Sequence, residues 1–111
     1  MTIYTISKEL CEIRLSRKLS GENKEQLFNE AMSGDREPIE LDRFTDLEKA
    51  KAAFKELTAE LTAYRQDESV KTSRYAGINL AIFQLYTIEE WNVDEDGDII
   101  DGGDVWEWEI V

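Results

Sequence analysis

The chain has 111 residues, with 13 Lys and Arg against 25 Asp and Glu, and a formal net charge of −12 at pH 7. This length fits one domain, and 41% hydrophobic with 34% charged residues indicates a globular chain rather than a disordered one. So acidic a chain is not expected to bind nucleic acid or an anionic membrane directly. The absence of histidine excludes a His-based metal site and a Ser-His-Asp triad.

The single cysteine, Cys11, cannot form an internal disulfide, which is typical of proteins from a reducing compartment. No apolar run approaches the length of a membrane span, and no signal peptide opens the chain. These features predict a soluble cytoplasmic protein. With no histidine to activate it, Cys11 is expected to be a buried thiol rather than a nucleophile.

The first elements are predicted to be strands. β-Branched and aromatic residues at 2–6 favour a short strand. Apolar residues at odd positions predict a second strand at about 10–16, and a helix over 7–18 is the alternative for this stretch.

A short helix and a short strand follow. Asn23 and Gln26 form a capping box, and apolar residues at helical spacing predict a helix over about 23–33, with Gly34 as its stop. The residues after Pro38 predict a strand at 39–44.

The strongest pattern in the chain predicts a helix over about 46–66. Thr45 and Glu48 form a capping box, with Thr45 as the N-cap. One apolar stripe follows at steps of three and four residues, formed by Leu47, Ala50, Phe54, Leu57, Leu61 and Tyr64. A helix with one apolar stripe is expected to pack on one side only.

The C-terminal third predicts a hairpin. A polar stretch at 67–74 indicates a loop, and the apolar residues after it predict a buried strand at 78–93. The acidic segment 94–97 ends in glycine and predicts a turn, and Gly102-Gly103 indicates a second break. A last strand is predicted to display Trp106, Trp108 and Ile110 on one face.

This order of elements predicts a single α+β domain over 1–111. We expect an antiparallel sheet, with the long helix (about 46–66) packed on it, a shorter helix (about 23–33), and an acidic C-terminal β-hairpin at about 78–111.

The negative charge is concentrated in that hairpin. Residues 1–74 contain 15 acidic and 13 basic residues, whereas residues 75–111 contain ten acidic residues and no Lys or Arg. Disordered acidic tails are poor in aromatic residues. This one contains all three tryptophans, so we expect it to be folded, at the cost of repulsion among its carboxylates.

A calcium loop is the first alternative for the acidic turn. Aligned to the EF-hand pattern, Asn92, Asp94 and Asp96 take positions 1, 3 and 5, and Gly97 takes position 6. Position 12 is Gly103, where a bidentate Glu should stand, and the flanks have strand periodicity. We therefore expect an ordinary turn with Gly97 at positive φ, and no metal.

No pattern for catalysis stands out. Asp94 and Asp98 could pair for acid–base work, but that work needs burial and a concave pocket for a substrate, whereas a turn rich in aspartate is wet and its carboxylates repel one another. Gly102-Gly103 is flanked by aspartates that would repel a phosphate. We expect neither an enzyme nor a cofactor.

A folded acidic surface with tryptophans is complementary to a protein that has a basic groove. Rows of carboxylates can approximate the charge of a short stretch of nucleic acid, so we expect mimicry of DNA toward a basic nucleic-acid-binding protein. The tryptophans are either core residues or anchors in the contact. The residues expected to meet the partner are Glu89, Glu90, Trp91, Asp94, Glu95, Asp96, Asp98, Asp101, Asp104, Trp106, Glu107 and Trp108.

Two segments carry a resemblance: Glu-Glu-Trp-Asn-Val-Asp-Glu-Asp-Gly-Asp-Ile-Ile-Asp-Gly-Gly-Asp-Val-Trp (89–106) and Phe-Thr-Asp-Leu-Glu-Lys-Ala (44–50). They resemble small acidic proteins of phages and mobile elements in Firmicutes-type bacteria, among which anti-CRISPR inhibitors of Cas nucleases recur. The resemblance implies a non-enzymatic inhibitor that occupies the nucleic-acid groove of a Cas nuclease in the bacterial host cytoplasm. The alternative is an acidic structural or regulatory module, antitoxin- or scaffold-like, without such mimicry.

Overall fold

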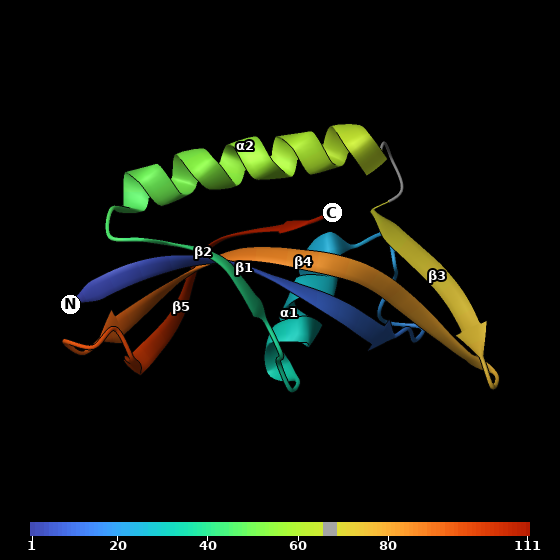
Figure 1. Ribbon diagram of the computed structural model, residues 1–111. Helices are drawn as coiled ribbons and strands as arrows, with labels where there is room; N and C mark the ends of the chain where they lie inside the picture. Colours follow the sequence, from blue (N-terminus) through green and yellow to red (C-terminus); the bar gives the residue numbers. More distant parts are fainter. Residues whose placement is uncertain (66–68) are drawn as a thin grey trace.

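Two long strands, β1 (Thr2–Arg14) and β4 (Ile78–Val93), form the centre of one antiparallel five-stranded sheet (Figure 1). The computed structural model describes residues 1–65 and 69–111. β2 (Ile39–Phe44) pairs with the outer side of β1, while β3 (Val70–Tyr75) and β5 (Ile99–Ile110) pair with successive parts of the outer side of β4. The described residues also form two helices, α1 (Lys24–Ser33) and α2 (Leu47–Arg65), so the predicted α+β class is confirmed.

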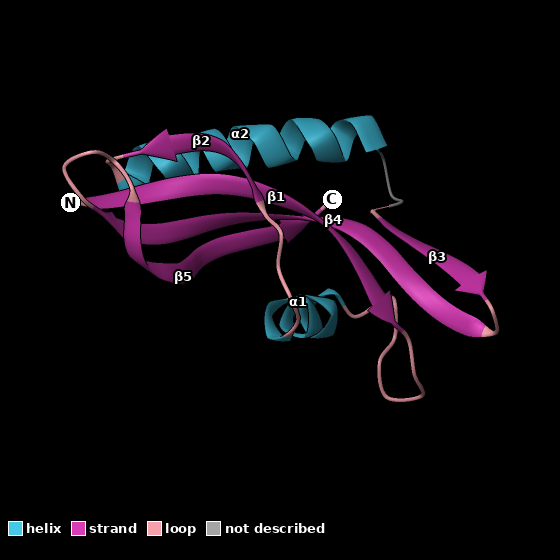
Figure 2. Cartoon of the chain, turned by 60° about the horizontal axis from the view of Figure 1, so that its bottom comes forward, coloured by secondary structure: helices cyan, strands magenta, loops and turns pink. Residues whose placement is uncertain are grey.

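The two helices cover opposite faces of the sheet (Figure 2). α2 packs through Ala50 and Phe54 on Ile6, Tyr86 and Ile88, and the C-terminal residue joins this cluster. The cluster under α1 lies on the other face, because side chains alternate along a strand. It contains Cys11, Leu27, Ala31, Ala81, Phe83, Leu85 and Ile110.

β1 is one uninterrupted strand, so the helix considered over 7–18 is wrong. Thirteen consecutive residues of β1 pair with β4 without a register shift. The burial of alternate side chains from Ile3 to Cys11 follows the two-residue period of a strand. The predicted break between the two strands is absent because β4 is long enough to pair with the whole of β1.

Both predicted helices form, with one correction at a cap. Asn23 caps α1 by accepting a hydrogen bond from the Gln26 amide at 3.1 Å. In α2 the cap is Asp46 rather than Thr45, because the Asp46 carboxylate accepts hydrogen bonds from the amides of Glu48 and Lys49. Ala50 and Phe54 of the apolar stripe are buried, and Tyr64, at its end, is 87% exposed. The half-buried members are Leu47, Leu57 and Leu61.

The loop predicted over 67–74 is in part a strand. Residues 66–68 lie outside the described part, but β3 pairs with β4 from Val70 onward. Almost all of β3 is exposed, so its side chains show no apolar alternation, and backbone pairing forms the strand. Ala76 and Gly77, both at positive φ, make the tight turn into β4.

β5 contains irregularities that the sequence did not place correctly. Gly102-Gly103 lies inside β5 and does not break it. Both glycines have positive φ, and a Cβ atom on Gly102 would stand 2.6 Å from the carbonyl oxygen of Glu90. A register shift also falls between the pairs Ile88–Glu107 and Glu89–Val105, so Trp106 does not share the face of Trp108, contrary to the prediction.

Within the described residues, no helix has both the length and the apolar character needed to cross a membrane.

Candidate functional site

The turn between β4 and β5 is held by its own backbone and by one carboxylate. Asp94 accepts hydrogen bonds from the amides of Asp96 and Asp98 at 2.9 and 3.0 Å. The Gly97 amide donates to the Asp94 carbonyl at 3.1 Å, and Gly97 has a φ of 83°, as predicted. The sequence therefore predicts this turn correctly. The turn positions the most acidic segment of the chain.

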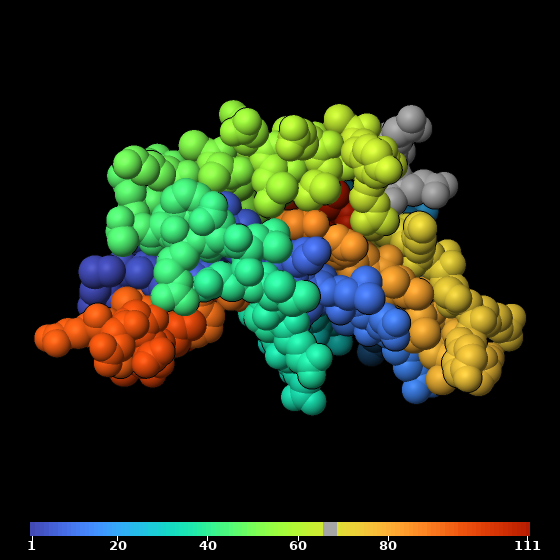
Figure 3. All heavy atoms as spheres, viewed as in Figure 1, coloured from blue at the N-terminus to red at the C-terminus, as the bar shows by residue number. Residues whose placement is uncertain are grey.

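The acidic turn projects from one end of the molecule (orange in Figure 3). Its side chains are exposed, as are two aspartates of β5; the six exposed residues are Asp94, Glu95, Asp96, Asp98, Asp101 and Asp104. Carboxylate oxygens of Asp94, Asp96 and Asp98 lie within 4.8 Å of one another. Six of the residues predicted to meet a partner thus form one exposed surface, which we call the acidic end.

The acidic end has no cationic partners among the described residues. Of the ten acidic residues after position 74, Glu89 alone takes part in an ion pair there. Arg43 of β2 does reach the turn, but its guanidinium donates to the carbonyl of Gly97 at 2.9 Å and pairs with Glu40. Arg43 therefore fixes the backbone of the turn and leaves its carboxylates unneutralised, a role that no sequence pattern indicated.

Glu89 was predicted to meet a partner, and the structure instead buries it. Its side chain is 1% exposed and forms an ion pair of 2.5 Å with Arg36, which also pairs with the buried Glu9 at 3.3 Å. Burial lowers the pKa of Arg36, but the hydrogen bonds and charges of Glu89 and Glu9 outweigh it and raise the pKa overall. Glu9 also accepts from the Glu37 amide at 2.6 Å. This buried cluster joins the segment after α1 to β1 and β4.

The three tryptophans have different environments. Trp91 is half-buried, and its indole nitrogen donates to the Thr5 hydroxyl at 2.9 Å. Trp108 stacks on Phe28 of α1, with ring centroids 4.5 Å apart. Trp106 is 49% exposed. The first two are structural, and Trp106 remains as a side chain that a partner could contact.

Trp106 lies on the face covered by α2, beside the acidic end. Its indole nitrogen donates to Glu90 at 3.3 Å, and the Lys51 ammonium lies 5.8 Å from the ring centroid. Partial burial, together with the charge of Glu90, raises the pKa of the nearby Tyr4 hydroxyl. Glu107, half-buried, lies in the same region across from Lys51.

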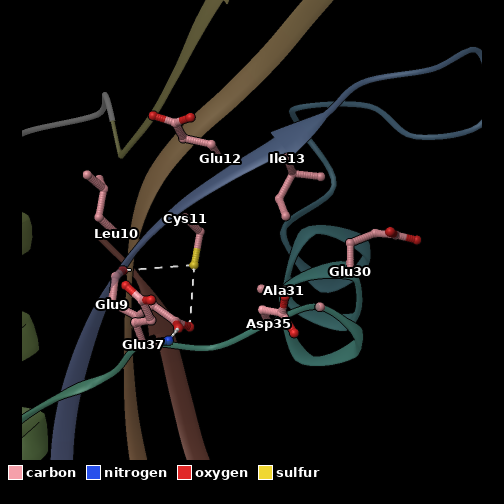
Figure 4. Close-up of a pocket in the computed structure, with 10 residues that line it drawn as sticks. Glu9, Leu10, Cys11, Glu12, Ile13, Glu30, Ala31, Asp35 and Glu37 are labelled. Atoms are coloured by element: carbon pink, nitrogen blue, oxygen red, sulfur yellow. Dashed lines mark hydrogen bonds between the residues drawn. The ribbon is translucent and has the colours of Figure 1, made fainter.

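A hollow of about 380 Å³ with several acidic residues in its walls lies between β1 and the end of α1 (Figure 4). Cys11 opens onto it, with its thiol 3.7 Å from the Glu9 carboxylate. Burial, then the charge and hydrogen bond of Glu9, raises the pKa of Cys11 to about 12. The thiol stays protonated at neutral pH, so it is a poor nucleophile and a poor metal ligand.

The three converging aspartates of the turn are also a candidate cation site. Calcium takes six to eight oxygen ligands. Three exposed carboxylates supply only part of that number, and Asp94 already accepts two backbone hydrogen bonds. The geometry is that of a turn stabilised by an aspartate.

Comparisons with known proteins assign no family. No family model matches the chain, and neither a curated protein nor a solved structure matches it. A functional proposal therefore depends on the charges and contacts of this chain and on the resemblance of segments 89–106 and 44–50.

Proposed function

We propose that the protein is a non-enzymatic inhibitor, encoded by a phage or mobile element, that occupies the nucleic-acid-binding groove of a nuclease as a DNA mimic. The observation that supports it most is the acidic end: six exposed carboxylates at one end of the molecule, none of them ion-paired within the described residues. Folding alone gains nothing from placing like charges together. A cationic partner would relieve that repulsion.

The spacing of the carboxylates suits a groove that binds nucleic acid. Oxygens in the turn lie within 4.8 Å of one another, and same-face residues along β5 repeat at about 6.6 Å. One strand of duplex DNA carries a phosphate about every 3.4 Å of its axis. The two charge densities agree within about a factor of two, so the acidic end can compete for cations that would otherwise bind phosphates.

A Cas nuclease is the class of target that fits the resemblance of 89–106 and 44–50. Such enzymes hold a nucleic-acid duplex in a positively charged channel. Binding in that channel would be steered by charge, with a fast, salt-sensitive association rate.

The test measures whether the protein competes with target DNA for binding to each of a panel of Cas nucleases loaded with guide RNA, at two salt concentrations. The variant Asp94→Asn, Asp96→Asn, Asp98→Asn, Asp101→Asn neutralises the acidic end. It should melt at or above the wild-type temperature, bind more slowly and show a flatter salt dependence. Its control neutralises exposed acids on the helices by the same four charges: Glu25→Gln, Glu30→Gln, Glu56→Gln, Glu60→Gln.

The control variant should inhibit like the wild type, because the two variants differ only in where the charge is removed. Unchanged affinity of a well-folded Asn variant would exclude the acidic end as the contact surface. Failure to compete with target DNA in every nuclease of the panel would contradict the nuclease as partner. Loss of stability in the Asn variant, with binding lost in parallel, would instead favour the structural module.

A further inference from the structure

The outer side of β5 offers unpaired backbone groups. The Val111 amide donates to the Gln84 carbonyl at 2.9 Å, and Ile110 pairs with Leu85 one step on. In an antiparallel pair, alternate residues turn their N–H and C=O groups toward the neighbouring strand. Counting from Val111, Glu109 and Glu107 bond to β4, and Trp108 directs its amide and carbonyl to the other side. No strand of the described residues pairs there.

A groove runs beside this edge, between β5 and α2. Two adjoining hollows of about 330 and 510 Å³ share Lys55, Thr58 and Glu109 in their walls. The rest of the α2 wall consists of Glu48, Lys51 and Phe54 and of four small side chains: Ala52, Ala59, Thr62 and Ala63. There is room above the edge for the side chains of an added strand.

Acidic residues outnumber basic ones along this groove, with Glu48, Glu107 and Glu109 against Lys51 and Lys55, and this excess favours a basic occupant. The segment 99–110 contains Asp101, Asp104, Glu107 and Glu109 and no basic residue. Glu107 and Glu109 face the groove, because their partners Ile88 and Tyr86 pack under α2. Neither glutamate is ion-paired among the described residues. A second copy of the chain would place acids against these acids, which is unfavourable.

We infer that the outer edge of β5 binds an extended, basic segment of the partner protein as an added antiparallel strand. Residues of that segment directly opposite Glu107 and Glu109 lie on the groove side and are Lys or Arg. The residue between them, opposite Trp108, points to the α1 face and is apolar. The recognised pattern is therefore basic–apolar–basic. This inference rests on the proposed function, since it specifies how the basic partner is held.

The test uses a blocked heptapeptide, Thr-Thr-Lys-Val-Lys-Thr-Thr, and follows the Trp108 backbone amide by NMR and hydrogen exchange. The valine faces Trp108, so its N–H points toward β5, whereas the lysine N–H groups point away. A single N-methyl group on the valine should weaken binding about tenfold, because it removes a hydrogen bond and blocks the edge. The same methyl group on one lysine, at equal charge, should leave the affinity within twofold.

A protein variant completes the test. Glu107→Gln with Glu109→Gln should weaken binding of the unmethylated peptide about fivefold, and Asp94→Asn with Asp96→Asn should change it less. Equal effects of the two methylations, or no binding at millimolar peptide, would overturn the added strand. A dimer of the free protein with a protected Trp108 amide would also overturn it, with a second copy as occupant. These outcomes are independent of DNA competition, so the two proposals can fail separately.

Discussion

Arg36→Met is expected to destabilise the protein severely, because it removes the only cation of the buried cluster. Glu89 is 1% exposed, Glu9 is 7% exposed and the Arg36 side chain is 20% exposed. Removing one partner of a buried ion pair typically costs about 3–5 kcal/mol, since it leaves charge uncompensated in the interior. Water can reach a fifth of Arg36, so the lower end, about 3 kcal/mol, is the better expectation.

A loss of this size is a large fraction of the stability of a small domain, which is about 5–15 kcal/mol. It corresponds to a melting temperature lower by about 15 °C. The assay is urea unfolding followed by circular dichroism and tryptophan fluorescence, with the free energy of unfolding extrapolated to water. The control is Arg43→Met, which removes an exposed ion pair with Glu40 and an exposed hydrogen bond to the Gly97 carbonyl, and should cost only about 1 kcal/mol.

A rescue variant separates lost charge balance from lost packing. Adding Glu9→Gln and Glu89→Gln to Arg36→Met removes the two uncompensated charges and keeps similar shapes. It should recover at least half of the lost stability if charge is the cause. If Arg36→Met stays within about 1 kcal/mol of the wild type, or if the triple variant recovers nothing, the reasoning is refuted.

Three further results are expected. Gly102→Ala should lower the free energy of unfolding by more than about 2 kcal/mol, because the added Cβ would meet the Glu90 carbonyl. Gly77→Ala, where no atom lies within 4 Å of the added Cβ, should lower it by only about 1 kcal/mol, because of the positive φ. Urea titrations of the two variants measure the difference. Folding raises the pKa of Cys11 from 9.0 to about 12, so iodoacetamide should label the folded protein at pH 8 roughly a thousandfold more slowly than the protein unfolded in urea. The free energy of unfolding should also fall as the pH rises from 9.0 to about 12, because the thiol of the unfolded chain ionises first. Calcium should raise the melting temperature no more than magnesium does, since the turn at 94–98 lacks a full set of oxygen ligands; a calcium-specific shift would contradict this.

Features encoded locally could be predicted from the sequence. The period of α2 and the glycine of the 94–97 turn indicated their structures because the deciding residues are neighbours in the chain. β3 could not be predicted in this way, since its exposed residues have no apolar alternation and β4 supplies the pairing. The α2 cap was misplaced by one position because Thr45 and Asp46 are both good caps.

The distribution of charge predicted the exposed acidic segment, but the predictions for Glu89 and Trp106 were wrong because contacts between distant residues decide where these two side chains lie. Glu89 is one of ten acids in a segment without bases, and its partner Arg36 lies 53 positions earlier, so no local pattern distinguishes it from the exposed ones. Trp106 was placed with Trp108 because a regular strand alternates, and the register shift at Glu107 reverses that relation.

Among the described residues, some acidic side chains have a cationic partner and others have none, and this difference bears on function. In the interior, Arg36 pairs with both Glu89 and Glu9, and at the edge Arg43 pairs with Glu40. In the turn, the same Arg43 bonds to a carbonyl, and Asp94 is satisfied by backbone amides. The carboxylates of the acidic end therefore still repel one another in the free protein.

Salt should reveal that repulsion through two opposite responses. Screening acts over about 10 Å at 0.1 M salt, so added NaCl should raise the melting temperature of the free protein by relieving repulsion among exposed carboxylates. The same salt should weaken the complex, because it screens the attraction to a basic partner. A module held by apolar contacts would show little weakening. The fourfold Asn variant of the acidic end should lose most of both responses. If its melting temperature depends on salt as strongly as that of the wild type, the repulsion lies elsewhere in the chain, and the acidic end is not the source of the charge available for binding.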